Sequence, residues 1–242
     1  MTKIFKYFDK KKVSKIENAF VAQKSLLGDV SDIVIFDVGA YIGETALKYR
    51  EIFPDSVVYC FEPFPDSFEK IKQSSNDKFI KPYQIAFSDT IGSKKLNINA
   101  DLSCNSFFPI VEQNKRYYPK SSKNIETVEV STTTIDNFCR KENIGNIDIL
   151  KLDVEGAEIL TLKGAHDKLS KQDISLIYAE VTFISHYENA CKFGELADFL
   201  FQYNYTLFNF YGLKTSKNGQ LRWGNAIFLS DKKRKQFEAN VL

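Results

Sequence analysis

Four acidic residues each lie at or near the end of an apolar run of this chain: Asp37, Glu62, Asp153 and Glu180. In an open α/β sheet, ligands bind beyond the carboxyl ends of the strands. If the four runs are strands of one sheet, their carboxylates meet at one edge of it. This shared position is stronger evidence for a site than any one of the acids.

The first acid opens a glycine turn. Asp37 is followed by Gly39 and Gly43, and a helical pattern begins after the second glycine. Because glycine lacks a Cβ atom, this turn can bring bare backbone against a small ligand. We expect Asp37 to order the turn and to contact one end of the ligand, with Gly39, Ala40, Tyr41 and Gly43 lining the same end.

The second acid indicates a ribose. Glu62 lies about 20 residues beyond the turn, at the tip of the second strand, where a carboxylate binds a ribose diol. A dinucleotide site requires a further glycine at the position of Tyr41, and a P-loop requires a Gly-Lys-Ser/Thr that is absent from the sequence here. The pattern favours a cofactor with ribose and adenine but no phosphates, of which S-adenosylmethionine (SAM) is the obvious one.

The middle of the chain resembles the FkbM-type SAM-dependent methyltransferases. The matching segments are 37–43, 61–63, 132–136, 150–158, 162–165 and 180–181. The match runs from about residue 31 to 183 and includes Pro63, whereas Tyr41 departs from it because the family usually carries Asn there. It implies a Rossmann-like class I fold in three α/β/α layers, with a seven-stranded, mostly parallel sheet and a C-terminal antiparallel hairpin. It also implies hydroxyl acceptors, commonly on sugars or on lipid or polyketide conjugates.

Alternating strand and helix patterns position these residues. Strands are expected near 33–38, 57–62, 80–86, 147–152 and 174–182, and helices near 43–53, 65–75, 134–143, 156–165 and 187–202. Such alternation predicts right-handed crossovers and a mostly parallel sheet. Two final strands, near 205–210 and 225–229, have no helix between them and should form the closing antiparallel hairpin.

One methyltransferase domain over residues 31–242, preceded by a helical extension over 1–30, is the simplest division. The rhythm breaks between 88 and 131, where two alternating segments, 94–99 and 127–132, could pair as a ribbon. A basic, aromatic stretch at 115–120 lies between them. We assign this insert to the acceptor side, because a long irregular insert in a compact domain is usually functional or mobile. A solvated loop is the alternative.

Two further sets of residues are assigned to the cofactor and the acceptor. Ala86 and Ser88 follow the third strand, in a turn that commonly lies beside adenine in this architecture. Asp153 should face the methyl group and orient or deprotonate the acceptor, with a helix N-cap as its alternative role. Glu155 is expected in the first turn of the next helix, in a mainly structural role, with contact to the acceptor as the alternative.

The fifth strand carries an acid among apolar residues. A buried carboxylate is costly unless it is paired or catalytic, and the candidate partners of Glu180 are Lys151 and a bound metal. With Asp153, Glu180 could hold a divalent cation that lowers the pKa of a hydroxyl, although a third ligand is not evident. His186, just after this strand, is a candidate general base near neutral pH. We therefore expect an SN2 methyl transfer to a hydroxyl, with Asp153, Glu180 and His186 as the catalytic residues.

The composition bounds the partners. The chain has 242 residues, 33 basic against 31 acidic, and its net charge of +2 gives no argument for nucleic acid. No apolar run approaches the roughly 18 residues that span a bilayer, and the lysine-rich start does not read as a signal peptide, so a cytoplasmic location is expected. The four cysteines form no C-x-x-C pair. The N-terminal helix and a sheet edge could support a homodimer.

Two other functions explain part of the pattern. A catalytically inactive SAM-binding module would keep the fold without turnover, but the intact acids and glycines argue against it. An NAD(P)-dependent reductase would explain Glu62 equally well, but not the missing middle glycine at Tyr41.

Overall fold

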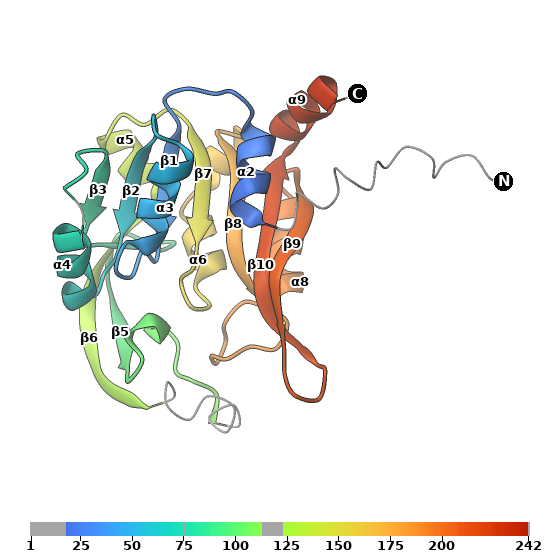
Figure 1. The fold of residues 1–242 in the computed structure, drawn as a ribbon. Coiled ribbons are helices and arrows are strands. Elements are labelled where there is room, and N and C mark those ends of the chain that lie inside the picture. The colour runs from blue at the N-terminus through green and yellow to red at the C-terminus, as the bar shows by residue number, and fades with distance from the viewer. Residues whose placement is uncertain (1–17, 75, 113–122, 242) are drawn as a thin grey trace.

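The apolar runs form a seven-stranded sheet at the centre of the fold. The computed structural model describes residues 18–74, 76–112 and 123–241, and its main sheet has the strand order β3-β2-β1-β7-β8-β10-β9 (Figure 1). The strands are β1 (Val34–Val38), β2 (Val57–Phe61), β3 (Ile80–Tyr83), β7 (Ile147–Leu152), β8 (Ile174–Thr182), β9 (Tyr205–Thr215) and β10 (Leu221–Ser230). β10 runs antiparallel to β8 and β9, and the other pairs are parallel. The mostly parallel sheet and its closing hairpin are therefore confirmed.

Helices cover both faces of this sheet. One layer holds α2 (Ala19–Leu27), α3 (Glu44–Ile52), α4 (Pro65–Ser74) and α9 (Asp231–Val241), and the other holds α5 (Ile135–Lys141), α6 (Glu158–Lys163), α7 (His166–Ser170) and α8 (Phe193–Phe201). Ile35 packs toward the first layer and its neighbour Phe36 toward the second, and both are fully buried. Strands buried on both faces read as continuous apolar runs, which explains the sequence pattern.

A second, three-stranded sheet is built from β4 (Ala86–Phe87), β5 (Gly92–Asn99) and β6 (Asn124–Thr133). β5 and β6 pair antiparallel, so the predicted ribbon pairing is confirmed, and β4 joins β6 in parallel. A short 3-10 turn, η1 (Leu102–Cys104), follows β5. The basic, aromatic stretch at 115–120 lies outside the described residues.

Several element boundaries differ from the prediction. The third strand ends at Tyr83, and the last predicted helix begins only at Phe193. The helix expected from residue 156 begins at Glu158, because Glu155 and Gly156 have φ angles of 51° and 96°. Those left-handed conformations are incompatible with an α-helix.

The start of the described chain packs onto the main body. The α2 residues Ala22 and Leu26 are 2 % exposed, and the Tyr49 hydroxyl of α3 donates to Gln23 Oε1 at 3.0 Å. The division at residue 30 and the homodimer both stay predictions.

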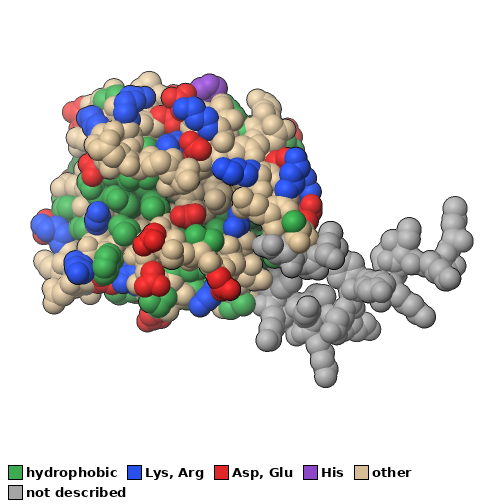
Figure 2. All heavy atoms as spheres, turned by 90° about the horizontal axis from the view of Figure 1, so that it is seen from above, with side chains coloured by type: hydrophobic (Ala, Val, Ile, Leu, Met, Phe, Trp, Pro, Cys, Tyr) green, Lys and Arg blue, Asp and Glu red, His purple; other side chains and the backbone are tan. Residues whose placement is uncertain are grey.

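Seen from above, basic and acidic side chains are interspersed across the face, with hydrophobic side chains between them (Figure 2). Within the described residues, no helix is long and apolar enough to cross a membrane.

Candidate functional site

Two adjoining cavities lie at the carboxyl edge of the parallel strands. They share five lining residues: Gly39, Tyr41, Ser103, Asp153 and Glu155. We name the first the Glu62 cavity, because Glu62, Pro63 and Ala86 line it with the end of β2. We name the second the Glu180 cavity. Its volume is about 440 Å³, and its other lining residues include Ala40, Lys151, Glu180, His186 and Trp223. Residues far apart in the sequence therefore meet at one edge, as expected for an open α/β sheet.

The glycine turn forms the wall between the cavities. Gly39 has a φ of 75°, and a Cβ built on it would lie 1.8 Å from the Asp153 carbonyl oxygen. Its N–H donates to the Phe61 carbonyl at 3.0 Å, which ties the turn to the end of β2. Gly43, with a φ of 87°, precedes α3 and lines neither cavity. Only glycine combines this conformation with so close a backbone approach at position 39.

A buried ammonium group lies beneath that turn. Lys151 Nζ donates to the Gly39 carbonyl at 2.8 Å and lies 3.0 Å from Asp37 Oδ1 and 3.6 Å from Asp153 Oδ2. Burial raises the pKa of Asp37, and Lys151 opposes that rise. Burial alone lowers the pKa of Lys151, but Asp37 and Asp153 raise it on balance, so the ammonium stays charged.

These contacts correct one prediction and refine another. Lys151 pairs with Asp37 and Asp153, so its predicted pairing with Glu180 is wrong. Asp37 is fully buried and lines neither cavity, so its direct contact with a cofactor stays a prediction. Lys151 was missed as an organiser of the turn, and the available signal was a charged residue inside the apolar run of β7.

Backbone groups fix Glu62 at the floor of its cavity. Its Oε2 accepts from the Tyr41 N–H at 3.0 Å, and its Oε1 accepts from the Phe64 N–H at 2.9 Å. The side chain is 8 % exposed, and burial raises its pKa to about 7 although both hydrogen bonds lower it. Tyr41 has a φ of 51°, which is uncommon for a residue other than glycine. The ribose role of Glu62 stays a prediction.

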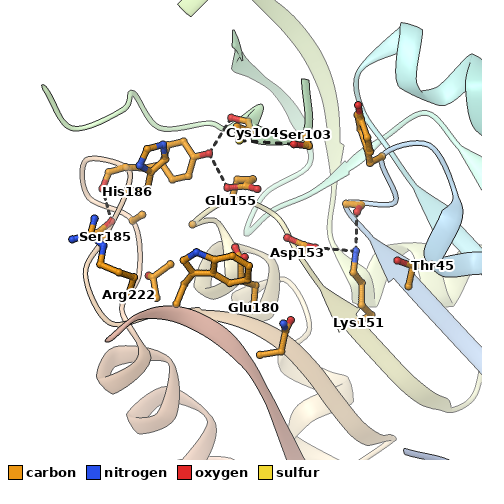
Figure 3. A pocket seen from close by; sticks show the side chains of 18 of the residues that line it. Thr45, Ser103, Cys104, Lys151, Asp153, Glu155, Glu180, Ser185, His186 and Arg222 are labelled. Atoms are coloured by element: carbon orange, nitrogen blue, oxygen red, sulfur yellow. Dashed lines mark hydrogen bonds and ion pairs between the residues drawn. The ribbon is translucent and has the colours of Figure 1, made fainter. Parts of the chain in front are cut away.

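Three carboxylates converge in the Glu180 cavity. Asp153, Glu155 and Glu180 each offer one oxygen, and these oxygens all lie within 4.8 Å of one another (Figure 3). The Tyr187 hydroxyl donates to Glu155 Oε2 at 2.7 Å, and its oxygen also lies 3.0 Å from the Cys104 carbonyl oxygen. Burial, with the charge of Asp153 next, raises the pKa of Glu155 to about 8 and that of Glu180 well above its usual value. A set of oxygen donors suits a hard divalent cation.

Two expectations for this loop are wrong. Glu155 does not lie in the first turn of a helix, because α6 begins at Glu158. The N-cap of α6 is Ala157, so Asp153 does not cap it. The left-handed pair at Glu155 and Gly156 instead forms a loop from which both carboxylates line the cavity. Sequence reasoning missed Tyr187 as a site residue and gave Glu155 a mainly structural role, with acceptor contact as the alternative; Glu155 lines the cavity.

The remaining predicted residues divide between the cavities and the core. His186 lines the Glu180 cavity, and burial followed by the charge of Arg222 lowers its pKa, which favours the neutral imidazole. The three predicted catalytic residues are therefore brought to one cavity, and their roles stay predictions. Ser88 is fully buried and lines neither cavity; its N–H donates to the Thr133 carbonyl at 2.9 Å. Its contact with adenine also stays a prediction.

Comparison with known proteins gives a family match and several named relatives. The model of the methyltransferase FkbM domain matches residues 37–207. The 2-O-methyltransferase NoeI of Sinorhizobium fredii is 24% identical over 176 residues, which cover 70% of this chain and 71% of NoeI. Methyltransferase sdnD of Sordaria araneosa is 28% identical over 186 residues, which cover 64% of this chain and 72% of sdnD.

Two solved structures with a similar arrangement are a methyltransferase and a methyltransferase domain. The METTL16 methyltransferase domain has a TM-score of 0.48 and 12% identity, covering 90% of this chain and 68% of that one. Magnesium protoporphyrin IX methyltransferase from Synechocystis, solved with bound SAM, has a TM-score of 0.46 and 10% identity, covering 91% and 79%. The strand order of the sheet itself defines the fold.

Proposed function

The chain belongs to the FkbM methyltransferase family, and from that membership we propose that it transfers the methyl group of SAM to a hydroxyl of a sugar, glycan or glycolipid. Methyl transfer from SAM is the activity of the family, and the chemistry of the acceptor is the proposed part. The name of NoeI, a 2-O-methyltransferase, supports a hydroxyl acceptor. The reductase alternative has no support in the family match.

The Glu62 cavity suits the adenosine half of SAM. Glu62 already accepts two backbone N–H groups, one at each oxygen. A carboxylate offers about four acceptor positions, so capacity remains for both ribose hydroxyls. Pro63 and Ala86 line the same cavity and suit the flat face of adenine. We assign the methionine half to the backbone at Gly39 and Ala40, which line the cavity beyond.

The Glu180 cavity carries the acceptor proposal. It combines carboxylates, which accept hydrogen bonds from hydroxyl groups, with the rings of Trp223 and Tyr187, which offer apolar surface. A sugar presents both kinds of surface. The cavity adjoins the Glu62 cavity through the wall at Gly39, so an acceptor bound here lies next to the assigned position of the methyl group.

The transfer itself requires alignment and the removal of one proton. The sulfonium is a strong electrophile, so holding oxygen, methyl and sulfur in line provides much of the rate. As the O–CH₃ bond forms, the C–S bond breaks, its electron pair stays on sulfur, and S-adenosylhomocysteine leaves. The hydroxyl proton passes to a base, for which His186, Asp153 and Glu180 are the candidates; such a base typically contributes about 10²–10⁴-fold.

Mass spectrometry tests the acceptor class. The protein is incubated with SAM and separate pools of sugar nucleotides, glycans and glycolipids, and the expected product has gained one CH₂ on oxygen. Asp153→Asn is the matched variant, since it keeps the size of a cavity side chain and removes its charge. Methylation confined to nitrogen or carbon, or no product from any pool while calorimetry shows SAM binding, would contradict the proposal.

A further inference from the structure

Glu180 brings a carboxylate into its cavity without a group that neutralises it. Its strand neighbours Ala179 and Val181 point to the opposite face of the sheet and are 0 % and 2 % exposed, whereas Glu180 lines the cavity. Within the described part of the chain, no hydrogen bond or ion pair to the Glu180 carboxylate is present. The loss of water around this carboxylate is the largest influence on its pKa, which it raises. Lys151, whose charge does reach Glu180, bonds Asp37 and Gly39 instead. An uncompensated carboxylate is costly, so this position indicates a bound cation.

Two other carboxylates point to the same spot. One oxygen from each of Asp153, Glu155 and Glu180 lies within 4.8 Å of the others. Oxygens that share one Ca²⁺ or Mg²⁺, with bonds of about 2.0–2.6 Å, lie at most about 5 Å apart. The observed separation therefore leaves room for one ion among the three side chains, which face one another across the cavity (Figure 3).

Neighbouring groups hold two of the three carboxylates in place. Tyr187 donates to Glu155 at 2.7 Å, and Lys151 lies 3.6 Å from Asp153. Ligating carboxylates are themselves commonly held by hydrogen bonds from outside the metal's own ligands. The arrangement thus combines a half-buried acid without a hydrogen bond or ion pair, a suitable spacing of the three carboxylates, and two carboxylates that neighbouring groups orient.

We propose that Asp153, Glu155 and Glu180 bind one divalent cation such as Mg²⁺, Mn²⁺ or Ca²⁺ in the Glu180 cavity. The three donors are hard oxygens, which these ions prefer. Three protein ligands leave further coordination positions facing the cavity.

The role of this cation rests on the proposed function, whereas its binding does not. A hydroxyl oxygen of the acceptor takes an open coordination position, and the cation lowers the pKa of that hydroxyl. The proton leaves to water or His186, the oxygen forms the bond to the methyl carbon, and the C–S electron pair remains on sulfur. The cation thereby makes the hydroxyl a better nucleophile.

Terbium luminescence tests the site without any methyl transfer. The chain has a single tryptophan, and Trp223 lines the same cavity, so light absorbed by Trp223 excites a Tb³⁺ ion bound there. We expect saturable emission from the wild-type protein, displaced by Mg²⁺, Mn²⁺ or Ca²⁺. Glu180→Gln and Glu155→Gln should each weaken Tb³⁺ binding at least about tenfold. Glu44→Gln is the matched control: it removes an exposed carboxylate from the lining of the same cavity and should leave Tb³⁺ affinity unchanged.

Several outcomes overturn the site. One is the lack of saturable emission from wild-type protein that binds SAM; another is equal Tb³⁺ affinity in wild type and in a folded Glu180→Gln or Glu155→Gln variant. Circular dichroism verifies folding, and Tyr187→Phe, with an expected loss of about tenfold, provides an independent variant if a carboxylate substitution prevents folding. Cation binding without sugar methylation would contradict only the acceptor proposal. Sugar methylation without cation binding would contradict only the cation site.

Discussion

The Glu62 cavity and the Glu180 cavity lie side by side at one edge of the sheet, yet they hold their carboxylates by different means. Glu62 is fixed by two backbone N–H groups from segments adjacent to its own strand. Glu155 is held by a tyrosine 32 residues away, and Asp153 by a lysine of β7. One cavity is thus specified mainly by backbone groups, and the other mainly by side chains, one of which comes from a segment 32 residues away. A site held by backbone groups suits a cofactor that a whole family shares, because substitutions leave those groups in place. A site held by side chains can change its acceptor through substitutions.

Lys151 is the link between the two cavities, so its removal should have the largest effect. Lys151→Met leaves Asp37 buried without its partner, which is expected to cost about 3–5 kcal/mol of unfolding free energy. Urea unfolding measures this. Asp37→Asn in the same chain removes the uncompensated charge and should restore part of the loss. A loss in Lys151→Met below about 1 kcal/mol would show that the pair does not hold the wall together.

Gly39→Ala should disrupt both cavities at once. The added Cβ meets the Asp153 carbonyl at 1.8 Å and the residue keeps a φ of 75°. Strain and overpacking together are expected to cost about 2–4 kcal/mol and to abolish SAM binding in calorimetry. Gly145→Ala is the control, because its Cβ would meet no atom within 4 Å. Equal SAM affinity in Gly39→Ala and wild type would contradict the close approach.

Glu62→Gln should damage the cofactor side alone. The substitution removes the negative charge to which the ribose hydroxyls and two backbone N–H groups donate. A hydrogen bond to a charged group contributes about 1.5–3 kcal/mol of binding free energy. We therefore expect SAM affinity to fall about 10–100-fold at pH 8 in calorimetry. Tb³⁺ affinity in the Glu180 cavity should not change. Unchanged SAM affinity would remove the ribose assignment.

The raised pKa of Glu62 predicts a pH dependence of SAM binding. Its pKa in the fold is about 7, against an ordinary value of 4.5, so ionising Glu62 reduces the stability of the free protein as the pH rises from about 4.5 to 7. Ribose hydroxyls donate to the charged form, so SAM affinity should rise as the pH passes through 7 and then level off. Calorimetry across this range measures it, and the Glu62→Gln profile should lack this rise.

Tyr41 gives the smallest expected effect. Its φ of 51° is one that asparagine adopts more readily, so Tyr41→Asn should increase the unfolding free energy by about 1 kcal/mol. The hydrogen bond from the backbone N–H of residue 41 to Glu62 remains in the variant. The reciprocal change, Asn143→Tyr at a φ of 54°, should lose a similar amount in the same unfolding experiment. A loss of stability in Tyr41→Asn would indicate that the tyrosine ring contributes more than the strain removes.

The same difference between the two cavities decides which of their features could be predicted from the sequence. The turn after β1 and the acid after β2 depend on residues close together in the chain, so spacing and residue type indicated them. The conformation of Glu155 was not indicated, because a helical pattern follows it and only Gly156, against Ala190, forces the loop. The partners of Tyr187 lie 83 and 32 residues away, and no local pattern reports such contacts.

The contact between Gly39 and the Asp153 carbonyl has a consequence for protein engineering. The loop that carries Asp153 and Glu155 presses its main chain against the glycine turn, so neither segment has room to change shape independently. A chimera that takes the loop after β7 from a relative with a different acceptor must therefore take that relative's β1 turn as well. Changing the acceptor preference in this fold therefore requires the transfer of two segments, even though one of them is assigned to the cofactor.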